Sequence, residues 1–356
     1  MMNSCNFIGN MQCPDGVDRV DNILEGYQRY QALLSALDLG LFEFLDKKKS
    51  GNRNEIAEGI GINGALSRDF LDLLVEDGFL YKDGEEYRNT RIAADFLLPS
   101  SMFYQGDVVR NLAKSSSWSD LSASLVRKEL LQGAGGIHKG PSPSFISGLG
   151  QKALRGELQG VVKAISGWRG FKNARRILDV GGGHGLYTIA LCQANPDLHG
   201  VVLDKAGVVE TTRRYISDYG LEDRITVEEK DICCDSIDSG YDIVLISHLL
   251  YKFRKNLAAI FETVHASLKP GGLFVSNHWF CAPGCAAVES GVQALSKSLQ
   301  SFGHPLCHEE KFDQLFVEKG FEIVTTTSAM TAFGPTRLQL AEKRKDLKAT
   351  CGGCGR

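Results

Sequence analysis

The fold is decided by one stretch of this 356-residue sequence, Leu178-Asp179-Val180-Gly181-Gly182-Gly183-His184-Gly185. The stretch joins an apolar run, which predicts a strand, to a helical pattern that begins at Leu186. Glycines allow the backbone to turn sharply and to approach a ligand closely, and a helix N-terminus favours an anionic group. We therefore expect a strand, a ligand-binding turn and a helix here.

Around this stretch, the region from about residue 173 to 343 alternates β-branched runs with helical patterns. This alternation predicts βαβ units, a parallel sheet and a doubly wound α/β domain. Seven strands are expected, at residues 176–180, 200–203, 225–228, 243–247, 273–277, 321–326 and 337–341. Ligands of such sheets bind beyond the carboxyl ends of the strands.

Acidic residues follow the second and third expected strands. Asp204 lies 21 residues after Gly183, where an acid suits the hydroxyls of a ribose. Asp231 can accept a hydrogen bond from an adenine amino group, with Ile232 against the ring. Either acid alone reads equally well as a solvated loop carboxylate, but acids after successive strands favour a nucleoside ligand. The glycine spacing is not the Gly-x-Gly-x-x-Gly of nicotinamide-binding turns.

The residues from about 22 to 100 predict helices followed by a hairpin with an Asp83-Gly84 turn, which is a winged-helix pattern. The helix at 64–77 would be the recognition helix of a DNA-binding protein. It carries one arginine and four acids, a sum of −3, and would meet phosphates unfavourably. We expect a folding or dimerisation module and no nucleic-acid partner.

The composition is that of a globular protein, with 43% apolar residues, 23% charged residues and a net charge of −3. No apolar run reaches the roughly 18 residues that a membrane span needs, so no membrane partner is expected. The first 20 residues are polar and lack the apolar segment of a signal peptide, which predicts a cytoplasmic location.

Taken together, these features resemble the class I S-adenosylmethionine-dependent methyltransferases. Within that class the chain is similar to the dimeric small-molecule O-methyltransferases, including the plant caffeic acid and animal hydroxyindole enzymes. The resemblance rests on the winged-helix half and on residues 178–185, 202–209, 223–225, 230–231, 268–272 and 318–321.

The resemblance implies a domain organisation and a homodimer. The expected parts are a tail at 1–20, a winged-helix dimerisation domain at 21–100, a helical connecting region at 101–172, a seven-stranded Rossmann-like methyltransferase domain at 173–345 and a tail at 346–356. The N-terminal domain is expected to help close the pocket of the partner chain.

The resemblance also implies S-adenosylmethionine as cofactor and assigns residues to it. Gly181, Gly182 and Gly183 should lie along its methionine portion and ribose. Asp204 should hold the ribose hydroxyls, and Asp231 with Ile232 should hold the adenine. Ser247, at the end of the fourth strand, should lie near the cofactor.

One segment departs from the family pattern at the catalytic base. The family has His, Asp and Trp where this sequence has Tyr251, Lys252 and Phe253. With a tyrosine at this position, the segment resembles that of bacteriochlorophyllide and hydroxycarotenoid methyltransferases. Tyrosine, with an ordinary pKa of about 10, is a poor base at neutral pH. It suits hydrogen-bond positioning, or a substrate that needs no strong base. His248, three residues earlier, is a second catalytic candidate or else a packed histidine.

Further candidates flank the expected pocket. His278 stands at the end of the fifth strand, where relatives have an acid, and is a candidate acid, base or orienting group. His304, Trp118 and Phe145 are expected to contact substrate, although loop hydrogen bonding or core packing is the alternative for each.

The ten cysteines predict reduced thiols and no metal site. Zinc sites use regularly spaced ligand pairs, and the spacings of Cys281, Cys285, Cys307 and His308 are irregular. The Cys351 and Cys354 pair lies in a glycine-rich end with no thioredoxin-like context.

The sequence thus predicts an enzyme that methylates a small organic molecule, with O-methylation as the leading activity. C-methylation of an activated carbon, such as one in a tetrapyrrole-like ring, is second because of Tyr251. A non-methyl use of S-adenosylmethionine and a non-catalytic regulator that senses this cofactor are also compatible with the same motifs.

Overall fold

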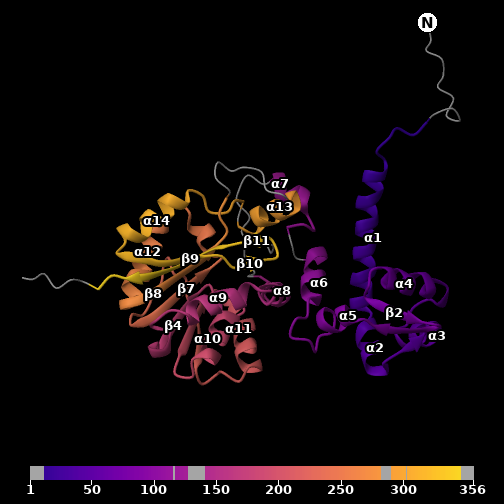
Figure 1. Ribbon diagram of the computed structural model, residues 1–356, viewed down its shortest axis with the longest axis horizontal. Helices are drawn as coiled ribbons and strands as arrows, with labels where there is room; N and C mark the ends of the chain where they lie inside the picture. Colours follow the sequence, from indigo (N-terminus) through magenta and orange to yellow (C-terminus); the bar gives the residue numbers. More distant parts are fainter. Residues whose placement is uncertain (1–11, 115–116, 127–140, 282–289, 302, 346–356) are drawn as a thin grey trace, which may run out of the picture. The chain divides into compact units, whose positions relative to one another are not determined.

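The computed structural model describes residues 12–114, 117–126, 141–281, 290–301 and 303–345. The chain divides into two compact units, Met1–Val109 and Arg110–Arg356 (Figure 1). Residues 1–11 of the expected first tail, the whole tail at 346–356, and Cys285, Cys351 and Cys354 lie outside the described residues. The end of the first tail is helical, because α1 begins at Asp18.

The first unit is helical with a small antiparallel sheet of order β1-β3-β2. The expected hairpin is present, since β2 and β3 pair from Leu80↔Asn89 to Asp83↔Glu86 and Gly84 adopts a φ of +59° in the turn. The elements are α1 Asp18–Asp38, α2 Leu41–Lys48, β1 Gly51–Asn52, α3 Arg53–Gly59, α4 Gly64–Glu76, β2 Leu80–Asp83, β3 Glu86–Asn89 and α5 Arg91–Phe96.

The core of this unit forms where the amphipathic helices meet the sheet. Phe42 and Leu45 of α2 are buried together with Leu71 and Leu74 of α4. Arg29 of α1 forms ion pairs with Glu76 and Asp77 at the end of α4, so part of the acidity of α4 is neutralised inside the unit.

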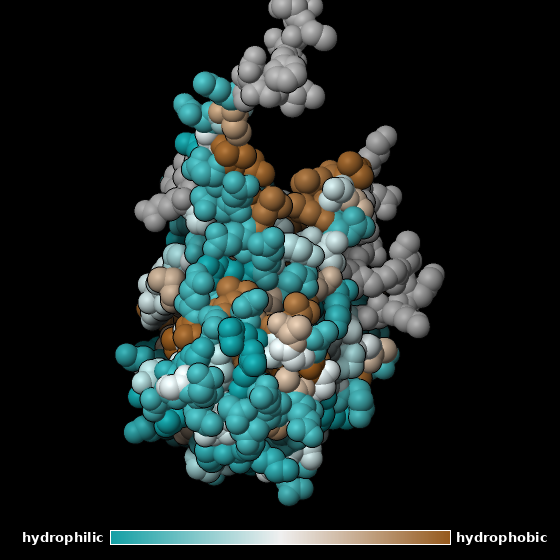
Figure 2. All heavy atoms as spheres, turned by 90° about the vertical axis from the view of Figure 1, so that its right-hand side faces the viewer, coloured by the Kyte–Doolittle hydropathy of each residue, from teal (hydrophilic) through white to brown (hydrophobic). Residues whose placement is uncertain are grey.

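Helix α1 carries apolar side chains that its own unit leaves exposed. Val20, Ile23, Leu24 and Tyr27 are each more than half exposed, and Figure 2 shows hydrophobic atoms along the upper part of this helix. A contiguous apolar helix face marks an interaction surface.

The second unit is built on a seven-stranded sheet of order β6-β5-β4-β7-β8-β12-β9. All seven expected strands are present, each within a few residues of its predicted bounds except β8, which begins earlier. They are β4 Arg176–Val180, β5 His199–Asp204, β6 Ile225–Glu229, β7 Tyr241–Ser247, β8 Leu268–His278, β9 Phe321–Thr327 and β12 Arg337–Lys343.

One strand runs against the parallel arrangement that the sequence predicts. Strand β12 pairs antiparallel with both β8 and β9. The link between β9 and β12 contains only the two-residue strands β10 Met330–Thr331 and β11 Gly334–Pro335, which is too short for the crossover that a parallel pair requires.

Two hydrophobic cores form because successive strand side chains point to opposite faces of the sheet. Ile177, Ile243 and Leu245 join the core with α9 and α10, whereas Leu178, Val244 and Ile246 join the core with α12 and α14. Figure 1 shows these helices on the two sides of the sheet.

The helices of this region are α6 Gly106–Lys114, α7 Leu121–Val126, α8 Pro143–Ala153, α9 Glu157–Ser166, η2 Phe171–Asn173, α10 Leu186–Ala194, α11 Ala206–Asp218, η3 Leu250–Phe253, α12 Leu257–Ser267, α13 Gly291–Gln300 and α14 Glu309–Glu318. Among the described residues, none of the helices has the length and apolar character needed to cross a membrane.

Candidate active site

Polar residues gather at one edge of the sheet, because the carboxyl ends of its parallel strands meet there. In sheet order, Asp231 follows β6, Asp204 ends β5 and the glycine turn follows β4. Ser247 and His248 stand at the end of β7, and His278 at the end of β8. This is the edge at which the sequence predicts the site.

The glycine turn is tight on its inner side and open on its outer side. A Cβ at Gly182 would lie 2.7 Å from both Asp179 Cγ and Val202 Cγ1, so no side chain fits there without rearrangement. Gly183 has a φ of +58°, and a Cβ on it would meet nothing within 4 Å. Its amide donates a 2.9 Å hydrogen bond to Asp204 Oδ2. The turn can therefore admit a ligand against its backbone.

The two predicted cofactor acids have different surroundings. Burial raises the pKa of Asp204, while hydrogen bonds from the Lys205 and Gly183 amides act in the opposite direction. Asp231 is more exposed, and the amide of Cys233, 3.0 Å away, lowers its pKa. Its neighbour Ile232 is buried in the core with α12 and α14.

A third acid, Asp179, lies beneath the glycine turn and is only 1% exposed. Thr188 Oγ1 donates to its Oδ2 over 2.9 Å. Burial raises the pKa of this carboxyl to about 7, and the charge of nearby Asp204 adds to the rise. The ionised form is therefore disfavoured in the folded chain.

This raised pKa predicts that stability falls as pH rises. The unfolded chain releases the Asp179 proton near pH 3.8 and the folded chain near pH 7, so the stabilising proton is lost through that interval. Between pH 6 and pH 8 we expect a loss of about 1.4 kcal/mol in the free energy of unfolding. In Asp179→Asn, whose amide oxygen can still accept from Thr188, this loss should disappear.

Urea denaturation of both proteins at pH 6 and pH 8 measures the effect. An identical pH dependence in the wild type and in Asp179→Asn would show that Asp179 does not titrate in this range.

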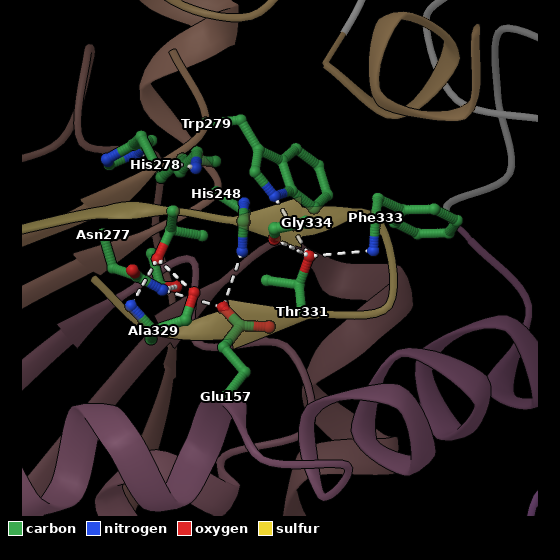
Figure 3. Close-up of polar contacts among 12 residues, drawn as sticks. Glu157, His248, Asn277, His278, Trp279, Ala329, Thr331, Phe333 and Gly334 are labelled. Atoms are coloured by element: carbon green, nitrogen blue, oxygen red, sulfur yellow. Dashed lines mark hydrogen bonds and ion pairs between the residues drawn. The ribbon is translucent and has the colours of Figure 1, made fainter. Parts of the chain in front are cut away.

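Across the site from the turn, His248 joins α9 to the end of β7. Its Nε2 lies 2.7 Å from Glu157 Oε1 (Figure 3). Its Nδ1 lies 3.0 Å from the Tyr251 hydroxyl. His248 has a φ of +52°, a conformation that non-glycine residues adopt rarely and often at functional sites. Its side chain is 25% exposed, so both of these contacts hold a ring that remains partly accessible.

Glu157 is a carboxylate almost enclosed by the protein, at 6% exposure. Burial alone would raise its pKa, but His248 and hydrogen bonds from Tyr187 and Asn277 shift the pKa downward overall. Asn277 Nδ2 donates to Glu157 Oε1 over 2.8 Å. A buried charge requires such partners, and the lowered pKa keeps Glu157 ionised at neutral pH beside His248.

Tyr251 is 1% exposed. It belongs to the hydrogen-bond network that links it to His248, Glu157 and Asn277. The Trp279 amide donates to its hydroxyl over 2.5 Å, and its ring stacks on the Trp279 indole at a centroid distance of 6.1 Å. Burial raises the pKa of the phenol well above its ordinary value. Tyr251 therefore remains protonated at neutral pH and donates to His248.

His278 is fully buried, and both of its ring nitrogens have partners within the fold. Its Nε2 accepts from the Leu249 and Leu250 amides at 3.2 and 3.1 Å, and its Nδ1 lies 3.0 Å from Ser276 Oγ. Burial and the neighbouring His248 lower its pKa well below the ordinary value. A neutral His278 thus holds the backbone that leads into Tyr251.

Trp279 covers the His248 ring, with centroids 4.2 Å apart. Its indole Nε1 donates to Thr331 Oγ1 over 3.2 Å, and Thr331 in turn donates to the Gly334 carbonyl over 2.7 Å. Figure 3 shows this chain of contacts from the strand end to the β10–β11 hairpin. The β10–β11 hairpin therefore fixes the position of the Trp279 indole over His248.

Comparisons with known proteins agree with this architecture. Residues 151–322 match the family model of the O-methyltransferase domain, and residues 22–99 match that of the O-methyltransferase dimerisation domain. The chain is an S-adenosylmethionine-dependent methyltransferase. The expected enzyme class, cofactor and α/β fold are confirmed, and the dimerisation domain is consistent with a homodimer.

Among curated relatives of this methyltransferase, the N,N-dimethyltransferase OxyT of Streptomyces rimosus is 27% identical, over 83% of this chain and 88% of that protein. The 3-hydroxy-5-methyl-1-naphthoate 3-O-methyltransferase of Streptomyces sahachiroi is 29% identical, over 68% and 72%. The solved structure of human N-acetylserotonin methyltransferase with SAM superposes with a TM-score of 0.74, at 18% identity, over 94% of this chain and all of that one.

The remaining predicted site residues are Ser247 and the three expected substrate contacts, and they differ in burial and in location. Ser247 accepts from Asn277 Nδ2 over 3.0 Å beside Glu157. Trp118 is half-buried in the turn before α7, and Phe145 is half-buried in α8. His304 is exposed and lies against two cysteines. The substrate contacts of the last three stay predictions.

Sequence reasoning missed Glu157, Asn277 and the role of Trp279. A signal for Glu157 exists, because it shares the buried line of α9 with Val161 and Ile165, at positions i, i+4 and i+8. A carboxylate on the apolar face of an amphipathic helix requires a polar partner.

Proposed function

We propose that this methyltransferase methylates a hydroxyl group of a small aromatic molecule, and that His248 is the general base, which receives a proton through the Tyr251 hydroxyl. The observation that carries the proposal is the contact of Glu157 with His248 Nε2 at 2.7 Å, with Tyr251 on the other ring nitrogen. A histidine oriented by a carboxylate is a common general base. The naphthoate O-methyltransferase among the relatives supports an aromatic hydroxyl as acceptor.

S-adenosylmethionine, when bound, supplies a methyl group on an electrophilic sulfonium. The residues proposed to hold it are Gly181, Gly182 and Gly183 in the turn, Asp204 at the ribose, and Asp231 with Ile232 at the adenine. Two observations fit this assignment: Gly183 opens outward where a Cβ would meet nothing within 4 Å, and Asp204 presents a half-buried carboxylate at the next strand end. Ser247 is proposed to border the same space.

The proton is proposed to move along the hydrogen bonds of the network. The substrate O–H bond breaks and the Tyr251 oxygen gains that proton, while the original Tyr251 proton passes to His248 Nδ1. Tyr251 is neutral before and after this relay, so its high pKa does not prevent it. The Glu157 carboxylate then stabilises the imidazolium, and His278 acts as a positioning residue through the Leu249 and Leu250 amides.

The enzyme is further proposed to act as a homodimer through its N-terminal unit. The exposed apolar face of α1 is formed by Val20, Ile23, Leu24 and Tyr27, and the last three belong to the matched dimerisation domain. Burying this face against a second copy would remove it from water.

The test is an assay with S-adenosylmethionine and a panel of aromatic compounds that carry a hydroxyl, an amine or an activated carbon. O-methylation is expected, with the product bearing one added methyl on oxygen by mass spectrometry and NMR. Methyl transfer to nitrogen or to carbon alone would replace the proposed acceptor and keep the enzyme class.

A further inference from the structure

A cluster of two thiols and an imidazole forms where two distant segments pair beyond β8. The backbone of Phe280 forms a parallel bridge with Leu306. The Cys281 amide donates to the Leu306 carbonyl over 2.8 Å, and the Leu306 amide donates to the Trp279 carbonyl over 3.0 Å. This pairing places Cys281 beside Cys307.

The ligand atoms of the cluster lie close to one another. Cys281 Sγ and Cys307 Sγ are 3.5 Å apart, and each sulfur lies 3.2 Å from His304 Nδ1. His304 Nε2 lies 3.5 Å from Cys281 Sγ. Both cysteines are half-buried, and His304 is exposed.

These separations approach those of a tetrahedral zinc site. With Zn–S bonds of about 2.3 Å and Zn–N bonds of about 2.0 Å, tetrahedral angles place two sulfurs about 3.8 Å apart and a sulfur about 3.5 Å from a nitrogen. The two sulfurs, 3.5 Å apart, differ from the first value by a few tenths of an ångström. Cys281 Sγ and His304 Nε2, also 3.5 Å apart, match the second value. A small side-chain adjustment therefore brings the three donors to three corners of such a tetrahedron.

The surroundings favour ligation. His304 Nδ1 lies 2.9 Å from the Pro305 carbonyl, and a proton donated there leaves Nε2 with the free lone pair. A histidine ligand commonly donates its other N–H in this way.

We propose that Cys281, His304 and Cys307 bind a zinc ion, with the fourth position left to water or another donor. Thiolate and imidazole donors suit Zn²⁺ better than Mg²⁺ or Ca²⁺. The site departs from the sequence prediction of no metal, and it gives His304 a ligand's role in place of the expected substrate contact. Cys281 lies two residues after Trp279, whose indole covers the His248 ring. A bound ion would therefore fix the position of this segment.

The test is zinc retention by the full chain under reducing conditions. After chelator treatment, loading with zinc chloride and dialysis, the wild type should retain about one zinc ion per chain, measured by mass spectrometry of the metal. Cys281→Ser, Cys307→Ser and His304→Ala should each retain at least about tenfold less. The control variant, with both Cys351→Ser and Cys354→Ser, should retain zinc as the wild type does.

A second measurement needs no variant. Cobalt(II) added to the reduced, metal-free wild type should give thiolate-to-cobalt charge-transfer bands, and zinc should abolish them. The proposal is overturned if the wild type retains no zinc and shows no such bands. It is also overturned if zinc is lost from the Cys351 and Cys354 variant but kept by the Cys281 and Cys307 variants.

Discussion

Replacing His248 by asparagine is expected to lower kcat by about 10²–10⁴-fold, the usual contribution of a general base. Asparagine is the informative substitution because His248 has a φ of +52°, and asparagine tolerates this left-handed conformation better than other non-glycine residues. The variant therefore keeps the backbone and loses the base. The rate is measured as S-adenosylhomocysteine formed with a weakly acidic phenol as acceptor.

Two further variants define the network. In Glu157→Gln the side-chain shape is kept while the charge that stabilises the imidazolium is removed. In Tyr251→Phe the relay oxygen is removed. Both should lower kcat by a similar order to His248→Asn. If Tyr251→Phe retains the wild-type kcat, the proton does not pass through the phenol.

The acidity of the acceptor separates base catalysis from a structural role. A strongly acidic phenol is already ionised at neutral pH and needs no base. With such an acceptor, the kcat of His248→Asn should therefore approach that of the wild type. The control is His199→Asn at an exposed position at the start of β5. An equal loss with acidic and weakly acidic phenols would contradict a base role for His248.

Replacing Asp204 by asparagine is expected to raise the Kd for S-adenosylhomocysteine by about 10²-fold or more. Each hydrogen bond from a ribose hydroxyl to a carboxylate contributes about 1.5–3 kcal/mol, and two such bonds are proposed. Both carboxylate oxygens of Asp204 already accept backbone amides, from Gly183 and from Lys205. An asparagine must therefore point its NH₂ group at one of these donors.

Isothermal titration calorimetry measures this affinity directly. Asp238→Asn, which neutralises an exposed acid in the same unit, is the matched control and should keep the wild-type Kd. Thermal unfolding of both variants checks that they are folded. An unchanged Kd in a folded Asp204→Asn protein would remove Asp204 from the proposed cofactor site.

The sequence by itself determined the elements and their chemical class. The alternation of β-branched runs and helical patterns located all seven strands, because strand and helix periodicities are local. The glycines of the turn were identifiable because a sharp turn with positive φ favours glycine, and Gly181, Gly183 and Gly185 all have positive φ. The direction of β12 followed only from the shortness of its connection to β9.

Only the tertiary structure decided which side chains share a site. Glu157 meets His248 across 91 residues, and Cys281 meets Cys307 across 26 residues. Neither pair has a local spacing rule, because each contact depends on how strands and loops far apart in the chain are packed. Burial likewise set the protonation of Tyr251 and His278, whose environments lie in the fold and in no segment of the sequence alone.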